Sequence, residues 1–208
     1  HTPNLGALAS DGALFESFFC TTPHCAPSRA SIQTGLLPHN HGMTQVSHCT
    51  FDDESVLRTD KPHWAQSLKA AGWRTGYFGK WHVDRSLELN KFGWDVDGEQ
   101  HNALYKRHQQ EVSKTGSQKK GLLLSGSVDG PEGYDSKVLY GVTEQPVEER
   151  MLGMTCHLAK EFLKDALTKN DAWCCFVSVI EPHDPFIAHK SFYDRYDVDA
   201  IPVPPNWN

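Results

Sequence analysis

The chain has 208 residues, of which 22% are charged and 38% hydrophobic, and its formal net charge at pH 7 is -6. This composition is typical of one sizeable globular domain and unlike that of a disordered chain. The acidic balance argues against nucleic acid as the main partner, because neutralising phosphates requires a basic surface. No apolar run in the sequence is long enough to span a bilayer.

The N-terminal part predicts two helices with a strand between them. Thr2-Pro3 is a helix-start pattern, and the helical spacing that follows it ends at Gly12. Residues 13–19, ALFESFF, predict a β-strand, and a second short helix is expected from Pro27 toward Gly35. Because the chain opens at a helix start, with neither Met nor a signal-peptide pattern, we expect it to be an internal part of a longer protein.

The rest of the chain alternates helix and strand. The predicted elements are a helix at 62–72, a strand at 73–80, a long amphipathic helix at 147–167 and a buried strand at 172–180. Polar, Gly/Ser-rich residues 99–141 are expected to form a surface insertion, and the Pro-containing tail 201–208 no regular element. The alternation predicts an α/β fold with a mostly parallel sheet.

Titratable residues follow each of the three predicted strands. Phe19 leads to the loop with Cys25, Phe78 leads to GKWH at 79–82, and Ile180 leads to EPHDPF at 181–186. In open α/β sheets, functional sites gather beyond the carboxyl ends of the strands. We therefore expect one site, built from Cys25, Arg29, Lys80, His82, His183 and Asp184.

The charges in this set indicate an anionic substrate group. Four of the six side chains, Arg29, Lys80, His82 and His183, can carry positive charge. A helix N-terminus beside Cys25 adds main-chain N–H donors and the positive end of a helix dipole. The prediction is an oxyanion of sulfur or phosphorus, held near a modified or activated cysteine.

Each residue also has a simpler interpretation. Taken alone, Cys25 would be a packed thiol, Arg29 an ion-pair partner and Asp184 a turn residue. Trp81 would either pack under the site or stack on a sugar. The His and Cys residues around Cys25 fit no closed zinc pattern, and six cysteines are too few for a disulfide scaffold in a chain of this length.

Four stretches together resemble the sulfatase family. Residues 25–29, CAPSR, match the pattern Cys-x-Pro-x-Arg, and GLLPHNHG (35–42), LKAAGWRTGYFGKWH (68–82) and EPHDPF (181–186) are also similar to the family. The likeness covers most of residues 1–98 and 145–186. It implies an alkaline phosphatase-like fold with helices on both faces of the sheet, in which residues 1–208 would be part of the catalytic domain.

The resemblance also implies a chemistry. In the family, a maturase enzyme oxidises the cysteine to Cα-formylglycine, and the hydrate of that aldehyde attacks sulfate esters. The implied roles are nucleophile for Cys25, hydrate stabilisation for Arg29, sulfate binding for Lys80, elimination base for His82, and sulfate contact or leaving-group acid for His183. Asp184 would face the substrate.

A divalent cation belongs to the implied site. The family binds calcium, or another divalent cation such as magnesium, and the formylglycine made from Cys25 would be one ligand. The other ligands and a second sulfate-binding lysine are expected outside this chain, so the chain alone is expected to be inactive. Gly6 and Val83-Asp84 depart from the Asp and the Leu-Gly that are common in the family at those places.

The expected function is hydrolysis of a sulfate ester on a small molecule or carbohydrate. Two alternatives stay open: a phosphodiesterase or phosphonate monoester hydrolase of the same superfamily, and an inactive fragment. The expected partners are the sulfated substrate and the maturase. By analogy with the family, the location would be periplasmic, secreted or lysosomal.

Overall fold

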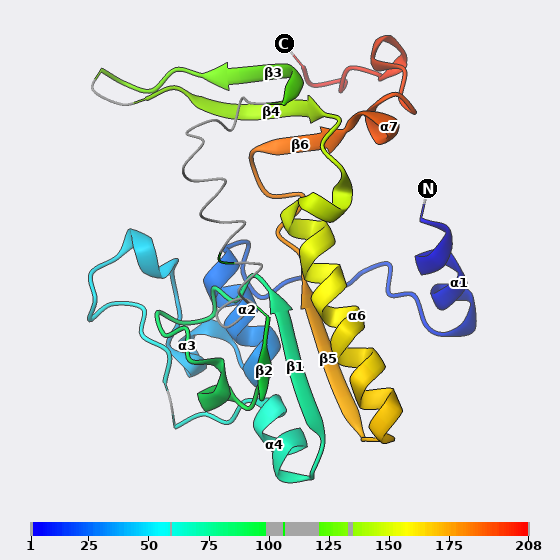
Figure 1. Ribbon diagram of the computed structural model, residues 1–208. Helices are drawn as coiled ribbons and strands as arrows, with labels where there is room; N and C mark the ends of the chain where they lie inside the picture. The colour runs from blue at the N-terminus through cyan, green and yellow to red at the C-terminus, as the bar shows by residue number, and fades with distance from the viewer. Residues whose placement is uncertain (1, 59, 99–105, 107–120, 133–134, 208) are drawn as a thin grey trace. The chain divides into compact units, whose positions relative to one another are not determined.

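The computed structural model describes residues 2–58, 60–98, 106, 121–132 and 135–207 (Figure 1). The chain forms two compact units. The first unit comprises His1–Pro62 with His82–Arg85, and the second comprises His63–Trp81 with Ser86–Asn208.

Short helices make up the first unit. They are α1 (Pro3–Asp11), α2 (Cys25–Thr34), α3 (Pro38–His41) and the 3₁₀ helix η1 (Ser47–Cys49). The predicted helix after Thr2 is confirmed as α1, and the second predicted helix as α2, which begins at Cys25 rather than at Pro27. Gly35 ends α2 in the left-handed region, at φ 71°, and donates its N–H to the Ser31 carbonyl at 2.8 Å.

The predicted strand at residues 13–19 is wrong. The segment forms neither helix nor strand, and its large apolar side chains are exposed, with exposed fractions of 71% for Leu14 and 84% for Phe19. The described part of the first unit contains no strand that could pair with it. A β-forming composition does not make a strand without a hydrogen-bonded partner strand.

The described part of the second unit contains two sheets and the longest of the described helices. Its elements are α4 (Trp64–Ala70), β1 (Arg74–Gly79), η2 (Leu89–Phe92), β2 (Val96–Asp97), β3 (Leu122–Val128), β4 (Lys137–Thr143), η3 (Val147–Glu149), α6 (Met151–Lys169), β5 (Trp173–Ser178), β6 (Phe186–His189), α7 (Lys190–Tyr193) and η4 (Val198–Ala200). The predicted helices at 62–72 and 147–167 are confirmed as α4 and α6. The predicted strands at 73–80 and 172–180 are confirmed as β1 and β5.

The first sheet is parallel throughout, with strand order β2-β1-β5. Strands β1 and β5 run in register from Arg74 opposite Trp173 to Gly79 opposite Ser178. Their carboxyl ends therefore lie at the same edge of the sheet. The residues that follow them, Lys80 and the 179–186 segment, both start from that edge.

Helices cover both faces of this sheet, as expected. Successive residues of a strand point to opposite faces. Phe78 belongs to a buried cluster with Ala159 and Phe162 of α6, which lies along β1 and β5 in Figure 1. Its neighbour Tyr77 stacks on Phe176 at a centroid distance of 5.0 Å, and Trp64 of α4 packs on the same Phe176.

The second sheet has the order β3-β4-β6 and is mixed. β3 and β4 pair antiparallel, and β4 and β6 pair parallel, from Tyr140 opposite Phe186 to Thr143 opposite His189. β3 and the first part of β4 fall within the range 99–141, where a surface insertion is predicted. Residues 99–105, 107–120 and 133–134 of that range lie outside the described residues.

Two further expectations concern the tail and the membrane. From 201 to 207 the chain contains neither helix nor strand, as predicted. Within the described ranges, no helix is both long and apolar enough to cross a bilayer.

Candidate active site

Cys25 is the first residue of helix α2, and Arg29 follows one turn later on the same side of that helix. The preceding residue, His24, has an extended backbone with φ -114° and ψ 141°. The first N–H groups of a helix have no acceptor within it, so those of α2 gather around Cys25, at the positive end of the helix dipole. Both Cys25 and Arg29 are half-buried, which leaves them accessible to a ligand.

A hydrogen-bonded network supports the helix that carries Cys25. The Thr21 hydroxyl donates to the Ser31 Oγ at 2.9 Å, and Ser31 Oγ lies 3.0 Å from His41 Nε2. Nδ1 of His41 accepts the Met43 N–H at 3.1 Å, so the proton of the neutral ring is on Nε2 and points to Ser31. His41 is buried, and burial lowers its pKa.

His82 lies in the same unit as Cys25 and Arg29. Its φ is +46°, in the left-handed region that costs a non-glycine residue about 1–2 kcal/mol. Its half-buried imidazole stacks on that of His48, with ring centroids 5.3 Å apart and an interplanar angle of 17°.

Lys80 follows the carboxyl end of β1 and belongs to the second unit. Its N–H donates to the Ser178 carbonyl at 2.8 Å. Its own carbonyl accepts the Tyr77 hydroxyl at 2.6 Å and the Ser178 hydroxyl at 2.8 Å. These three bonds fix the main chain at the point where the half-buried Lys80 side chain leaves the sheet.

His183 and Asp184 lie in the turn that follows β5, also in the second unit. The His183 N–H donates to the Ile180 carbonyl at 3.0 Å. Nδ1 of His183 lies 2.8 Å from the Asp184 carbonyl oxygen and 3.1 Å from its carboxylate. The side chains of His183 and Asp184 are 48% and 64% exposed, so both are open to a ligand.

The six predicted site residues therefore divide into two groups. The first unit holds Cys25, Arg29 and His82, and the second holds Lys80, His183 and Asp184. Within the second unit, the residues follow the ends of two adjacent parallel strands, which is the arrangement that the sequence predicted for them.

Sequence reasoning did not select His48, Ser178 or Arg85. His48 stacks on His82, Ser178 is hydrogen-bonded to Lys80, and Arg85 is hydrogen-bonded to the loop that carries His48. Ser178, the last residue of β5, carried a usable signal, because polar groups at strand ends face the site edge of such sheets. The ring contact between His48 and His82 depends on the path of the 47–55 loop and had no sequence signal.

Other predicted alternatives are decided by burial. Trp81 is 1% exposed and packs on Tyr77 and Phe92, at centroid distances of 5.1 and 5.3 Å, so it belongs to the core.

All six cysteines are free. Burial raises the pKa of Cys174, and of Cys175 to about 11, which keeps both thiols protonated and unreactive.

No zinc site forms in the part of the chain that the structure describes. There, no group of three or more His, Cys, Asp or Glu side chains is placed to hold a metal ion. In the described residues, Cys25 therefore has no cluster of carboxylates beside it that could complete a calcium site.

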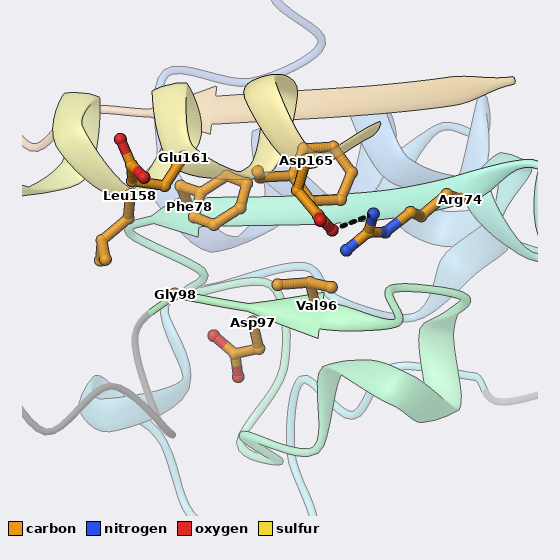
Figure 2. A pocket seen from close by; sticks show the side chains of 9 residues that line it. Arg74, Phe78, Val96, Asp97, Gly98, Leu158, Glu161 and Asp165 are labelled. Carbon is orange, nitrogen blue, oxygen red and sulfur yellow. Dashed lines mark ion pairs between the residues drawn. The ribbon is translucent and has the colours of Figure 1, made fainter. Parts of the chain in front are cut away.

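A cavity of about 310 Å³ lies in the second unit between α6 and the β1–β2 edge of the sheet (Figure 2). Arg74 and Asp165 form an ion pair at its wall, and the Arg74 guanidinium lies 5.2 Å from the centre of the Phe162 ring. None of the six predicted site residues lines it. Its wall cation, Arg74, is paired with Asp165, and Glu161 is paired with Lys164, so we do not assign the reaction to this cavity.

Known proteins are similar to this chain over nearly its whole length. The family model described as Sulfatase matches residues 1–202. The choline-sulfatase of Rhizobium meliloti (strain 1021) is 29% identical to the chain over 233 aligned residues, which cover 98% of the chain and 39% of that protein. Human N-acetylgalactosamine-6-sulfatase is 32% identical over 102 residues, covering 45% of the chain and 20% of that protein.

Solved structures resemble the fold. The phosphonate monoester hydrolase of Silicibacter pomeroyi gives a TM-score of 0.68 at 22% identity, over 98% of the chain and 41% of that protein. The phosphonate monoester hydrolase of Agrobacterium radiobacter gives 0.65 at 21% identity, over 98% and 40%. The chain thus spans about two fifths of the length of these proteins. The match over residues 1–202 shows that the chain belongs to the sulfatase family.

Proposed function

We propose that the whole protein hydrolyses a sulfate ester of a small molecule or a carbohydrate, with Cys25 converted to Cα-formylglycine as the nucleophile. The observation that carries this proposal is the position of Cys25. It opens helix α2 within the pattern Cys-x-Pro-x-Arg, and Arg29 stands one turn later, in a chain of the sulfatase family. Negative charge develops on the sulfate oxygens during this reaction, and the N–H groups and positive dipole end at a helix N-terminus stabilise such charge.

An aldehyde suits this reaction better than a thiol. A thiolate that attacked sulfur would end as a stable S-sulfonate. A maturase with a two-electron oxidant would convert the CH₂–SH group to a thioaldehyde, and water would then replace the sulfur, which leaves as hydrogen sulfide. The resulting aldehyde adds water to give a hydrate with two hydroxyls.

The two hydroxyls allow a covalent intermediate that clears itself. The oxygen of one hydroxyl attacks sulfur, the bond from sulfur to the ester oxygen breaks, and the alcohol leaves with a proton. The second hydroxyl then loses its proton, the bond from carbon to the sulfated oxygen breaks, and sulfate leaves. The aldehyde is restored and water hydrates it again.

The predicted residues have distinct parts in these steps. Arg29 stabilises the hydrate and Lys80 binds the sulfate oxygens through charge-assisted hydrogen bonds. His82 takes the proton in the elimination, and His183 contacts the sulfate or protonates the leaving alcohol. Asp184 beside His183 faces the substrate.

Calcium or magnesium remains part of the proposal. The formylglycine made from Cys25 would give one oxygen ligand, and the cation would screen the charge of the sulfate. The described residues include no cluster that completes such a site, so no step of the reaction is derived through the metal.

Turnover by the whole protein, prepared in a host that contains the maturase, tests the proposal. We expect it to hydrolyse 4-nitrophenyl sulfate, and Cys25→Ala to lower kcat by about 10³-fold or more. Cys20→Ala, which changes an exposed cysteine of the same unit, is the control and keeps full activity. The 208-residue chain alone is expected to release no sulfate.

The same preparation distinguishes the alternatives. Faster hydrolysis of an aryl phosphonate monoester or an aryl phosphodiester than of the aryl sulfate would favour the second function. Equal activity of the wild type and Cys25→Ala would contradict the proposed nucleophile. Choline sulfate and a sulfated N-acetylgalactosamine, suggested by the names of two relatives, test whether the substrate is a small molecule or a sugar.

A further inference from the structure

Two imidazoles of the first unit lie face to face. The rings of His48, on η1, and His82 have their centroids 5.3 Å apart at an interplanar angle of 17°. His48 is exposed, whereas His82 is half-buried. The predicted elimination base is therefore covered on one ring face by a side chain from a distant part of the sequence.

The main chain of His82 is constrained where its ring must be oriented. Its φ of +46° is unusual for a residue with a side chain, and the neighbouring Val83 is fully buried. Backbone conformations of this kind persist only where the surrounding structure holds them, and they are concentrated at functional sites.

Arg85 ties the loop that carries His48 to the segment that carries His82. Its guanidinium donates to the main-chain carbonyls of Ser47 at 3.1 Å, Phe51 at 2.8 Å, Glu54 at 3.2 Å and Ser55 at 3.3 Å, and to the Thr50 hydroxyl at 3.2 Å. A planar guanidinium with five N–H groups can hold several acceptors at once, which an ammonium group cannot do in the same geometry.

We propose that His48 is a positioning residue for the reaction proposed above. Held by the Arg85-clamped loop at 47–55, its imidazole stacks on His82 and fixes the plane of the ring that accepts the proton in the elimination step. A base acts efficiently only when its nitrogen points at the proton that it removes, so a loose ring costs rate rather than affinity. This inference depends on the proposed function.

Kinetics of the whole protein on 4-nitrophenyl sulfate give the first test. We expect His48→Ala to lower kcat by roughly 10- to 100-fold while KM stays within about twofold. His48→Phe keeps a ring on the same face and is expected to retain kcat within about threefold. His39→Ala removes another exposed histidine of the same unit and serves as the matched control.

A double-mutant cycle tests the clamp. Arg85→Lys is expected to lower kcat in the same way. Arg58→Lys is the control and is expected to keep kcat, because the Arg58 guanidinium donates to the Asn40 carbonyl at 3.1 Å and not to the 47–55 loop in the described residues. Because Arg85 acts through His48, adding Arg85→Lys to His48→Ala should lower kcat little further. If the fold-losses in kcat of the two single variants multiply in the double variant, Arg85 does not act through His48.

The ring contact itself has a readout that needs no turnover. The NMR signal of the His82 ring, assigned by its loss in His82→Gln, is expected to shift in His48→Ala and to stay in place in His39→Ala. An unshifted His82 signal would overturn the stacking.

The outcomes separate this inference from the function on which it rests. An inactive wild type, or an active Cys25→Ala variant, would overturn the proposed function and this role with it. Activity that depends on Cys25 but is unchanged in His48→Ala would overturn the positioning role alone.

Discussion

The hydroxyl of Ser178, the last residue of β5, donates a 2.8 Å hydrogen bond to the carbonyl oxygen of Lys80, the first residue after β1. The same two residues are joined by the bond from the Lys80 N–H to the Ser178 carbonyl, also 2.8 Å long. The main-chain position of Lys80, the proposed sulfate-binding lysine, is thus set by the neighbouring strand.

Replacing Ser178 with Ala tests this link. The Lys80 carbonyl would keep the Tyr77 hydroxyl and lose one donor, so we expect the free energy of unfolding to fall by about 1 kcal/mol. Urea denaturation of the purified variant measures the loss. Ser127→Ala, at an exposed position of β3, should change the free energy of unfolding by less than about 0.5 kcal/mol. Equal effects of the two substitutions would contradict the link.

Gly79 has to be a glycine because of its contact with β5. Its φ is +98°, and a Cβ placed there would lie 2.1 Å from the Ser178 carbonyl oxygen, which is main chain and cannot turn away. We expect Gly79→Ala to lower the free energy of unfolding by roughly 2–4 kcal/mol.

Gly72 provides the matched control for that substitution. Its φ is +82°, but a Cβ there would meet nothing within 4 Å, so Gly72→Ala carries the backbone strain alone, about 1–2 kcal/mol. If the two variants lose the same stability in urea denaturation, the collision with β5 is not the cause.

His41 makes stability depend on pH. Burial lowers its pKa below the ordinary value of 6.5, partly opposed by a hydrogen bond to the Pro27 main chain. Just below pH 6.5 the unfolded state binds more protons than the folded state. The contribution of neutral His41 to the free energy of unfolding is therefore complete well above pH 6.5, and it is lost as the pH falls toward the lower pKa of the folded state. We expect the free energy of unfolding to decrease between about pH 7.5 and about pH 5.5.

The variant His41→Gln should weaken this pH dependence, since glutamine does not titrate. It also loses the hydrogen bonds of the His41 ring with the Ser31 hydroxyl and the Met43 N–H, so its free energy of unfolding should be lower at every pH. His157→Gln, at an exposed position of α6, should leave the pH dependence unchanged. The explanation is wrong if the free energy of unfolding of His41→Gln changes with pH as steeply as that of the wild type.

Lys80 is expected to act on the anion of the substrate. Lys80→Gln removes a charge-assisted hydrogen bond worth about 1.5–3 kcal/mol, so kcat/KM for an aryl sulfate should fall by roughly 10- to 100-fold. Lys61→Gln changes a lysine that pairs with Asp60 at 2.8 Å in the other unit and should keep kcat/KM. Comparable losses in both variants would point to general electrostatics rather than to a binding site.

Much of the second unit was predictable from the sequence because its signals are local. The apolar runs that end at Gly79 and Ser178 predict parallel strands. The apolar residues before Lys169 recur at helical spacing over a long segment, which predicts α6. The polar residues just beyond the strands then predict the site edge.

The remaining features depend on contacts between distant residues. Residues 13–19 have a strand composition but no strand beside them in the described part of their unit. The stacking of His48 on His82 follows from five bonds that Arg85 makes to the 47–55 loop. Neither periodicity nor motif spacing carries information of that kind.

The central claim is that Cys25 becomes an aldehyde, and peptide mass spectrometry tests it most directly. In the whole protein purified from a host with the maturase, the peptide with the aldehyde is predicted to be about 18 Da lighter than the same peptide with an unmodified Cys25, and residue 25 is predicted to escape alkylation by iodoacetamide. A peptide found only with Cys25 alkylated as an ordinary thiol would contradict the account.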